Sequence, residues 1–242
     1  ETMRDRAIAF VPASGRQCTT LSTMFGSHLQ GMPIIAENGT YVVRDGVDIS
    51  SSTIDPNLTR EVITGVRQLR NDGHDVGLVV ATKSIAYLER GDDPFVSHVA
   101  TYYHSHRIVK DLSEHTDDVI KLSIYDFREA SEATYPTMQR TAPEHQVILA
   151  TPNWVDIMNP GVNKGSAVEA VQRDLGVTAD QTAIFGDFLN DLEMMPMAKW
   201  SFAMANGHPN IVKASNYVAP PNTENGVITV LAALLGTRVP IT

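Results

Sequence analysis

Short apolar runs alternate with longer segments whose apolar residues are spaced as on one face of a helix. Continuous apolar runs are typical of strands buried on both faces, and spacings of roughly three and four residues are typical of helices. The runs predict strands over residues 7–13, 33–36, 76–81, 182–185, 201–205 and 217–219. The helical spacings predict helices over residues 17–30, 55–71, 164–175, 209–214 and 226–235, and a helix that starts in 189–195.

The middle of the chain, residues 83–145, has a different character. It is more polar, it is richer in histidine and tyrosine, and its periodicity is weaker. Strands are predicted over 119–125 and 147–150 and a helix over 130–140. An α/β domain split by an inserted α+β domain explains this change, because alternating strands and helices imply a parallel, doubly wound sheet. We therefore expect an α/β core from residues 1–56 and 158–242 and an inserted domain from residues 57–157.

The composition narrows the class of protein. The chain has 242 residues, of which 43% are hydrophobic, as in a globular protein with one large or two modest domains. No apolar run has membrane-spanning length, and no signal peptide is visible. The formal net charge of −9 argues against general binding to nucleic acids or anionic membranes. The single cysteine, Cys18, favours a reducing environment, and we expect a cytoplasmic protein.

Two acids follow the predicted strand that ends at residue 185. Asp187 and Asp191 stand four positions apart in the segment GDFLND at 186–191, with Asn190 between them. Mg²⁺ takes oxygen ligands and usually keeps several waters, so acids at the end of a buried strand predict a magnesium site. The alternative is a helix N-cap with an acidic first turn, which is equally compatible with these residues taken alone.

Three further segments place polar groups at strand ends or helix starts. Ser14 and Gly15 begin a turn after the first predicted strand, and Asn38 follows the second. Lys164 would stand at a helix N-terminus, where backbone N–H groups favour anions. Ligands of open α/β sheets bind beyond the carboxyl ends of the strands, so these residues are candidate anion ligands. Taken singly, Ser14 and Gly15 are equally compatible with an ordinary strand-to-helix turn with a serine N-cap, and Asn38 with a simple turn. Lys164 alone is equally compatible with a solvated surface lysine.

Together these segments resemble the haloacid dehalogenase-like superfamily, and within it the Cof-type phosphatases with the subclass IIB cap. The matching segments are ASGR at 13–16, AENG at 36–39, GVNKG at 161–165, GDFLND at 186–191, and FAMANG at 202–207 with the stretch through Asn222 to Gly226 and Val227. Their order and rough spacing match over nearly the whole chain. The resemblance implies phosphoryl transfer through an aspartyl-phosphate, with the inserted domain as the cap.

The resemblance also implies roles for individual residues. Ser14, with Gly15 and Asn38 beside it, would bind the transferring phosphoryl group. Lys164 would stabilise the nucleophile and the phosphoryl charge. Asp187 and Asp191 would form the Mg²⁺ site, Asp187 as a ligand and Asp191 partly through the lysine or a bound water. Asn190 would approach the phosphoryl oxygens.

The sequence departs from the family at its first motif. The D-x-D-G-T pattern, which carries the nucleophile and the general acid/base, occurs nowhere in the 242 residues. In the family it lies on a central strand some way before the segment that matches Ser14. A sheet without that strand would expose strand edges, so we expect the natural protein to have it upstream of Glu1.

The expected function is Mg²⁺-dependent hydrolysis of a small phosphorylated metabolite such as a sugar phosphate. Two alternatives stay open: a phosphotransferase or phosphomutase on the same scaffold, and a catalytically dead binding or regulatory domain, which is what loss of the nucleophile would leave. No nucleic-acid or membrane partner is expected. The sequence identifies neither the substrate nor the oligomeric state.

Overall fold

The computed structural model describes residues 2–237, and the chain divides into two compact units. The first unit extends to Val162 and the second begins at Asn163. The predicted division into a core of residues 1–56 and 158–242 and an inserted domain of residues 57–157 stays a prediction. Glu1 and residues 238–242 of that predicted core lie outside the described residues.

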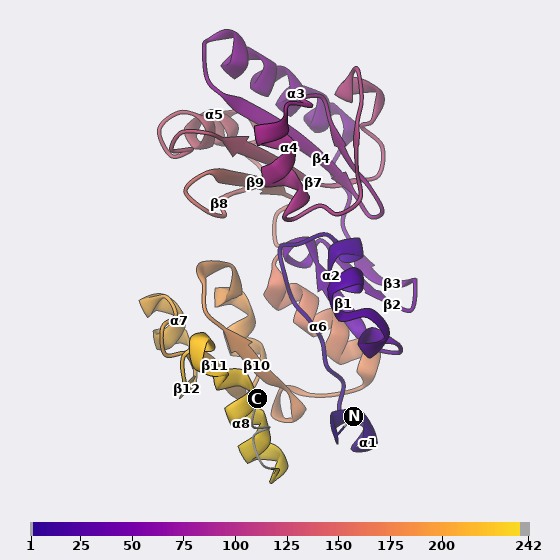
Figure 1. The fold of residues 1–242 in the computed structure, drawn as a ribbon, viewed down its shortest axis with the longest axis vertical. Coiled ribbons are helices and arrows are strands. Elements are labelled where there is room, and N and C mark those ends of the chain that lie inside the picture. Colours follow the sequence, from indigo (N-terminus) through magenta and orange to yellow (C-terminus); the bar gives the residue numbers. More distant parts are fainter. Residues whose placement is uncertain (1, 238–242) are drawn as a thin grey trace. The chain divides into compact units, whose positions relative to one another are not determined.

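A six-stranded sheet forms the larger part of the first unit (Figure 1). Its strands, in spatial order, are β6 (His106–Ile108), β5 (Ala86–Leu88), β4 (Val76–Thr82), β7 (Val119–Asp126), β9 (Trp154–Met158) and β8 (Gln146–Leu149). All neighbours are antiparallel except β5 and β6. The predicted strands over 76–81, 119–125 and 147–150 are confirmed.

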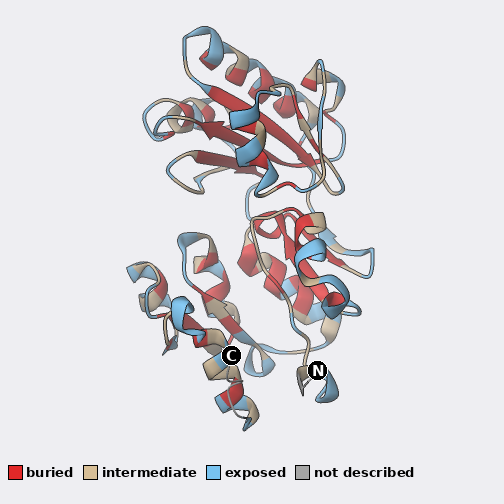
Figure 2. Ribbon diagram, viewed as in Figure 1, coloured by how far each residue is buried: buried red, intermediate tan, exposed pale blue. Residues whose placement is uncertain are grey.

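Helices cover the two faces of this sheet. On one face, α3 (Pro56–Asn71) and α5 (Thr134–Thr141) pack on Leu122 and Ile124 of β7 and form a hydrophobic core. Figure 2 shows the central strands as almost continuously buried. On the other face, α4 (Asp93–Ala100) places Phe95 against Gly77, where a Cβ atom would lie 2.3 Å from the ring. Gly77 thus lets the helix approach the sheet closely.

A smaller antiparallel sheet lies in the first seventy residues. It contains β1 (Pro33–Ala36), β2 (Tyr41–Arg44) and β3 (Val47–Ser51), and α2 (Cys18–Phe25) packs on β1. The short α1 (Thr2–Asp5) precedes it. Asp45 and Gly46 connect β2 and β3 with φ angles of 49° and 80°, which a tight hairpin turn requires. The helix predicted over 17–30 is confirmed, with a 3₁₀ turn from Gly26 to Leu29 ending it.

The predicted strand over residues 7–13 is wrong as a regular strand. Only Ala13 pairs, in parallel with Ile35, through hydrogen bonds of 3.0 Å from Ser14 N to Ile35 O and 2.9 Å from Ile35 N to Pro12 O. Pro12 has no N–H group with which to continue the ladder. Phe10 is exposed rather than buried. The apolar run is therefore an extended segment beside β1, and it is not buried on both faces.

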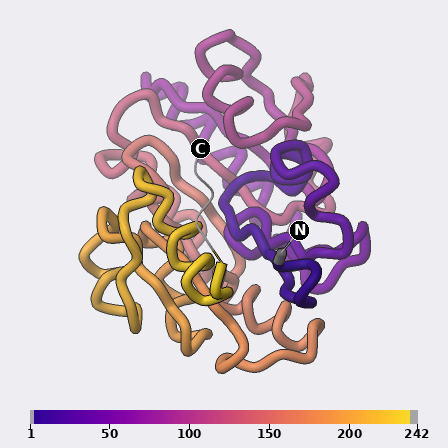
Figure 3. Tube along the Cα trace, turned by 60° about the horizontal axis from the view of Figure 1, so that its bottom comes forward, coloured from indigo at the N-terminus to yellow at the C-terminus, as the bar shows by residue number. Residues whose placement is uncertain are grey.

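The second unit is an α/β unit with a parallel sheet. The strands β10 (Ala183–Gly186), β11 (Trp200–Met204) and β12 (Tyr217–Ala219) pair in this order, all in parallel. The helices are α6 (Lys164–Leu175), α7 (Pro209–Ala214) and α8 (Gly226–Leu235), and a 3₁₀ helix runs from Leu189 to Met197 (Figure 3). The predicted strands and helices of this region are confirmed, the one after residue 188 as a 3₁₀ helix with Pro196 inside it. Among the described residues, no helix is long and apolar enough to cross a membrane.

Candidate active site

Lys164 is the first residue of α6, and the residues around it fix that helix start. Asn163 is the N-cap: its side-chain oxygen accepts a 2.9 Å hydrogen bond from the backbone N–H of Ser166. The hydroxyl oxygen of Ser166 in turn accepts a 3.2 Å hydrogen bond from the N–H of Asn163. Such a capping box satisfies N–H groups that would otherwise lack partners. It also fixes the backbone from which the Lys164 side chain leaves.

The side chain of Lys164 is buried with that of Asp191. The ammonium group donates a 2.6 Å hydrogen bond to Oδ1 of Asp191, and the two side chains are 5% and 8% exposed. The other oxygen, Oδ2, accepts hydrogen bonds of 3.0 Å from the N–H of Asp187 and 3.4 Å from that of Phe188. Asp191 therefore both pairs with the lysine and caps the backbone after β10. The Asp191 carboxylate thus accepts backbone hydrogen bonds, as in the helix-cap alternative, and also pairs with Lys164, as in the predicted site.

Asp187 directly follows β10, and its side chain is accessible. Its Oδ2 accepts a 3.1 Å hydrogen bond from Nδ2 of Asn222, which follows β12. Asn222 also exchanges hydrogen bonds of 2.9 and 3.1 Å with Asn206, which follows β11. The carboxyl ends of all three parallel strands thus carry connected polar side chains, at the sheet edge where α/β proteins bind ligands.

A metal ion at this edge would have Asp187 as its ligand. Its Oδ1 has no hydrogen bond to the described residues, which leaves a hard oxygen available. No group of three histidine, cysteine, aspartate or glutamate residues gathers as a metal site in the part of the chain that the structure describes. One or two carboxylates with waters and substrate oxygens suffice for Mg²⁺, so the donor set fits this ion with few protein ligands.

In the first unit, the structure brings Ser14, Gly15 and Asn38 together. The N–H of Asn38 donates to Ser14 O at 3.0 Å, and that of Glu37 donates to Arg16 O at 3.0 Å. A Cβ atom on Gly15 would lie 2.9 Å from Oδ1 of Asn38, so the two turns touch at this point. The hydroxyl oxygen of Ser14 accepts a 3.2 Å hydrogen bond from Arg16 N–H. Its own hydrogen is then directed elsewhere, available to an anion.

The predicted site residues thus form one group in each unit. Ser14, Gly15 and Asn38 are in contact in the first unit, and Lys164, Asp187 and Asp191 in the second. Asn190, partly buried, is in the 3₁₀ helix beside Asp191. Each of the two groups belongs to a single compact unit.

Three buried charges were missed by the sequence predictions. Glu37, Lys121 and Asp156 are 1%, 2% and 5% exposed. Nζ of Lys121 lies 2.5 Å from Oε2 of Glu37 and 3.7 Å from Oδ2 of Asp156. Apart from this ion pair, neither side-chain oxygen of Glu37 has a hydrogen-bond partner among the described residues. Two of them could have been found in the sequence, because Lys121 and Asp156 each interrupt an apolar run, at 119–126 and 154–158.

Burial and mutual charge shift the pKa values of this cluster. Burial raises the pKa of Glu37, and the neighbouring Lys121 only partly opposes that rise. For Lys121, burial alone would lower the pKa, but Asp156 and Glu37 outweigh it and raise the pKa well above its usual range. The lysine is therefore charged, and Glu37 holds a proton more tightly than an exposed glutamate does.

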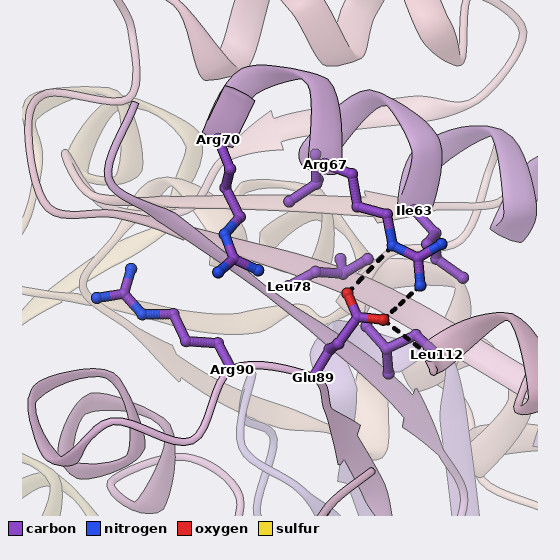
Figure 4. Close-up of a pocket in the computed structure, with 8 residues that line it drawn as sticks. Ile63, Arg67, Arg70, Leu78, Glu89, Arg90 and Leu112 are labelled. Atoms are coloured by element: carbon purple, nitrogen blue, oxygen red, sulfur yellow. Dashed lines mark hydrogen bonds and ion pairs between the residues drawn. The ribbon is translucent and has the colours of Figure 1, made fainter. Parts of the chain in front are cut away.

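A small polar pocket lies between α3 and the six-stranded sheet, and none of the predicted site residues lines it. Figure 4 shows Arg67 bound to Glu89, with Arg70 and Arg90 nearby. Arg67 also pairs with Asp111, and Arg90 with Asp75 and Asp92. The cavity measures about 10 Å³, which is room for about one water molecule. Its size and its internal ion pairs make it a structural feature of the sheet and not a substrate site.

The fold and the polar sheet edge of the second unit are those of an α/β protein that binds a ligand beyond the carboxyl ends of its parallel strands. The haloacid dehalogenase-like hydrolase family matches residues 1–231, and the chain belongs to this family. The predicted family, the α/β fold class and the assignment as a phosphatase-type enzyme are thereby confirmed.

Relatives and solved structures agree with this family. A 5-amino-6-(5-phospho-D-ribitylamino)uracil phosphatase of Escherichia coli, YbjI, is 28% identical over 99% of this chain and 88% of its own length. A haloacid dehalogenase-like hydrolase from Bacteroides thetaiotaomicron superposes with a TM-score of 0.83 at 20% identity, over 96% of this chain and 88% of its own. The subclass IIB sugar phosphatase BT4131 gives a TM-score of 0.77 at 19% identity, over 96% and 87%. The two solved structures show the fold alone.

Proposed function

We propose that the protein is a Mg²⁺-dependent phosphatase that hydrolyses a small phosphorylated metabolite through an aspartyl-phosphate intermediate. The observation that carries the proposal is the buried Lys164–Asp191 pair beside the accessible carboxylate of Asp187. A buried ammonium group next to a free carboxylate oxygen at the carboxyl edge of a parallel sheet suits a phosphoryl group together with a cation.

In this proposal Lys164 and Asp191 act as a unit. One N–H of the ammonium group is used by Asp191, and its other donors are available to the phosphoryl oxygens and to the attacking carboxylate. Because Asp191 also accepts two backbone hydrogen bonds, the lysine is held against a fixed partner. Phosphoryl transfer depends mainly on such positioning and on charge stabilisation.

Asp187 and Asn222 would hold the metal side of the site. Asp187 offers Oδ1 to Mg²⁺, with Asp191 in support through the lysine or a bound water, and Asn222 fixes the orientation of the Asp187 carboxylate. The ion, when bound, would neutralise charge on the phosphoryl oxygens. Asn190 would donate a hydrogen bond to the same oxygens, and Ser14, Gly15 and Asn38 are the proposed phosphate ligands of the first unit. The family's D-x-D-G-T nucleophile has no counterpart in these 242 residues, so the roles of these side chains concern binding and orientation.

The substrate class is proposed by analogy with a relative, and residues 57–157 would serve as the cap. The relative that aligns over 99% of this chain is named as a phosphatase of a phosphorylated ribitylaminouracil. A polyol or sugar phosphate is therefore the proposed substrate. A cap that closes over the site would exclude water and select the leaving group. We place the protein in the cytoplasm.

The test is phosphate release by the full-length protein from a panel of phosphate monoesters in the presence of Mg²⁺. The panel contains sugar phosphates, polyol phosphates, phosphorylated ribitylaminouracil and a general aryl phosphate. We expect release from at least one class, and a fall of roughly 100-fold or more in Lys164→Met. Lys213→Met, an exposed lysine of α7, is the matched control and should retain full activity.

Three results would contradict the proposal. Turnover that is unchanged in Lys164→Met would refute the assigned site. A rearranged phosphate ester without free phosphate would make the protein a mutase. Saturable binding of a phosphate ester without any turnover would make it a binding domain.

A further inference from the structure

Lys121 is a buried lysine in the middle of a sheet, and no step of the proposed reaction uses it. It lies on β7, between β4 and β9, and its neighbours Leu122 and Ile124 belong to the hydrophobic core under α3. The alternation of a strand places Lys121 and Ser123 on the opposite face. Asp156 pairs with Ser123 across β7 and β9 and lies on this same face.

The Lys121 side chain connects this sheet to the turn that contains Ser14. Its ammonium group donates a 3.0 Å hydrogen bond to the carbonyl oxygen of Gly15 and pairs with Glu37. Asp156 accepts hydrogen bonds of 2.6 Å from the hydroxyl of Ser123 and 3.1 Å from Nδ2 of Asn38. Three segments far apart in the sequence thus meet at one buried cluster.

The peptide group between Gly15 and Arg16 transmits this contact to Ser14. A peptide group is planar, so fixing its carbonyl oxygen also fixes the direction of its N–H group. Lys121 holds the Gly15 carbonyl, and the Arg16 N–H of the same peptide donates to the hydroxyl oxygen of Ser14 at 3.2 Å. One rigid group therefore lies between the ammonium group and the serine hydroxyl.

The turn beside it is held in an unfavourable backbone conformation. Glu37 and Asn38 have φ angles of 52° and 58°, the left-handed region that residues other than glycine seldom adopt. Such residues persist only where the surrounding structure holds them, and they gather at functional sites. Buried ion pairs add little stability compared with apolar residues of similar size, so stability alone does not explain the cluster.

We propose that Lys121 is a positioning residue that orients the Ser14 hydroxyl toward the phosphoryl group through the Gly15–Arg16 peptide, with Glu37 and Asp156 holding the lysine in place. This inference rests on the proposed function, in which Ser14 donates to the phosphoryl group. It assigns to the six-stranded sheet a direct part in shaping the phosphate-binding turn.

The test is a coupling experiment on the full-length protein. The variant Lys121→Met/Glu37→Gln removes the ammonium group without leaving its closest partner as a lone buried carboxylate. We expect kcat/KM to fall about ten-fold or more in this variant, because small misplacements of binding groups are costly. In a Ser14→Ala background, the same double change should alter kcat/KM by no more than about two-fold. Lys110→Met, an exposed lysine, is the matched control.

Equal losses in the two backgrounds would overturn the inference, because Lys121 would then act on folding or on another group. A readout without activity separates this failure from failure of the proposed function. In Lys121→Met/Glu37→Gln the Arg16 amide should exchange its hydrogen about ten-fold faster or more, measured by NMR, whether or not a substrate is found. Unchanged exchange at Arg16 would also overturn the inference.

Discussion

The ammonium group of Lys164 and Oδ1 of Asp191 are joined by a hydrogen bond of 2.6 Å between two nearly buried side chains. The lysine begins α6, and the aspartate lies in the 3₁₀ helix that follows β10. The contact therefore fixes the start of a helix against the carboxyl end of a strand. It also places a cation beside Asp187, whose N–H group donates to the same Asp191 carboxylate.

Removing the lysine should strongly destabilise the fold. Lys164→Met leaves the buried Asp191 carboxylate without its cation, and breaking a buried pair in this way costs about 3–5 kcal/mol. We expect that decrease in the free energy of unfolding, measured by urea denaturation. The double variant Lys164→Met/Asp191→Leu should recover much of the loss, because it leaves no unpaired charge. A double variant less stable than Lys164→Met would show that the ion pair is not the reason.

The helix start also tolerates no added side chain at Gly165. A Cβ atom there would lie 2.3 Å from the backbone carbonyl oxygen of Glu193, and a backbone group cannot easily move aside. Gly165→Ala should lower the free energy of unfolding by about 2 kcal/mol or more. It should also reduce phosphatase activity, because α6 must shift with Lys164.

A matched glycine provides the control for this prediction. Gly65, inside α3, would place its Cβ atom 3.3 Å from the mobile end of Met138. Gly65→Ala should change stability by less than about 1 kcal/mol, since alanine favours the helix. Similar losses from both substitutions would contradict the close approach at Gly165.

The buried carboxyl group of Glu37 predicts a pH-dependent stability. Burial raises its pKa, so the folded state binds this proton more tightly than the unfolded state does. The contribution of Glu37 is then fully present below about pH 4.3, the ordinary glutamate value, and is lost as the pH rises above it. Glu37→Gln lacks this titration. The stability of the variant relative to the natural protein should therefore increase with pH from about 4.3 upward, in urea denaturation series. A constant or decreasing difference would contradict the raised pKa.

Local patterns predicted most helices and strands of both units. The helix over 164–175 and the strands at 33–36 and 217–219 are found with these same bounds, because their apolar spacing and their turn residues agree. The strand at Trp154–Met158 was missed, since Asp156 interrupts its apolar run. The prediction of a strand over 7–13 was wrong, because strand pairing depends on neighbouring strands and Pro12 lacks the N–H group that pairing needs. The apolar pattern alone contains no information on either point.

Candidate site residues could be named from the sequence in several segments, but their mutual contacts could be predicted most directly within one segment. Asp187, Asn190 and Asp191 share one short motif, so their proximity was readable from the sequence. The pairing of Lys164 with Asp191 came from the family resemblance. The ion pairs of Lys121 with Glu37 and Asp156 join residues that are far apart in the chain. Burying any one of these charges alone would be unfavourable, so the sequence does not predict their burial without knowledge of the contacts.

If Asp187 binds the metal ion of a phosphatase, replacing its carboxylate should remove most of the Mg²⁺-dependent activity. Phosphate release from a general aryl phosphate is measured for the full-length protein and for Asp187→Asn, as Mg²⁺ is removed with a chelator and then restored. Asp180→Asn, an exposed acid of the same unit that pairs with Lys199, is the control.

We expect the natural protein and Asp180→Asn to lose activity on chelation and to recover it with Mg²⁺, and Asp187→Asn to stay roughly 100-fold or more below them at every Mg²⁺ concentration. Activity that survives chelation, or an Asp187→Asn variant that matches Asp180→Asn, would contradict the claim.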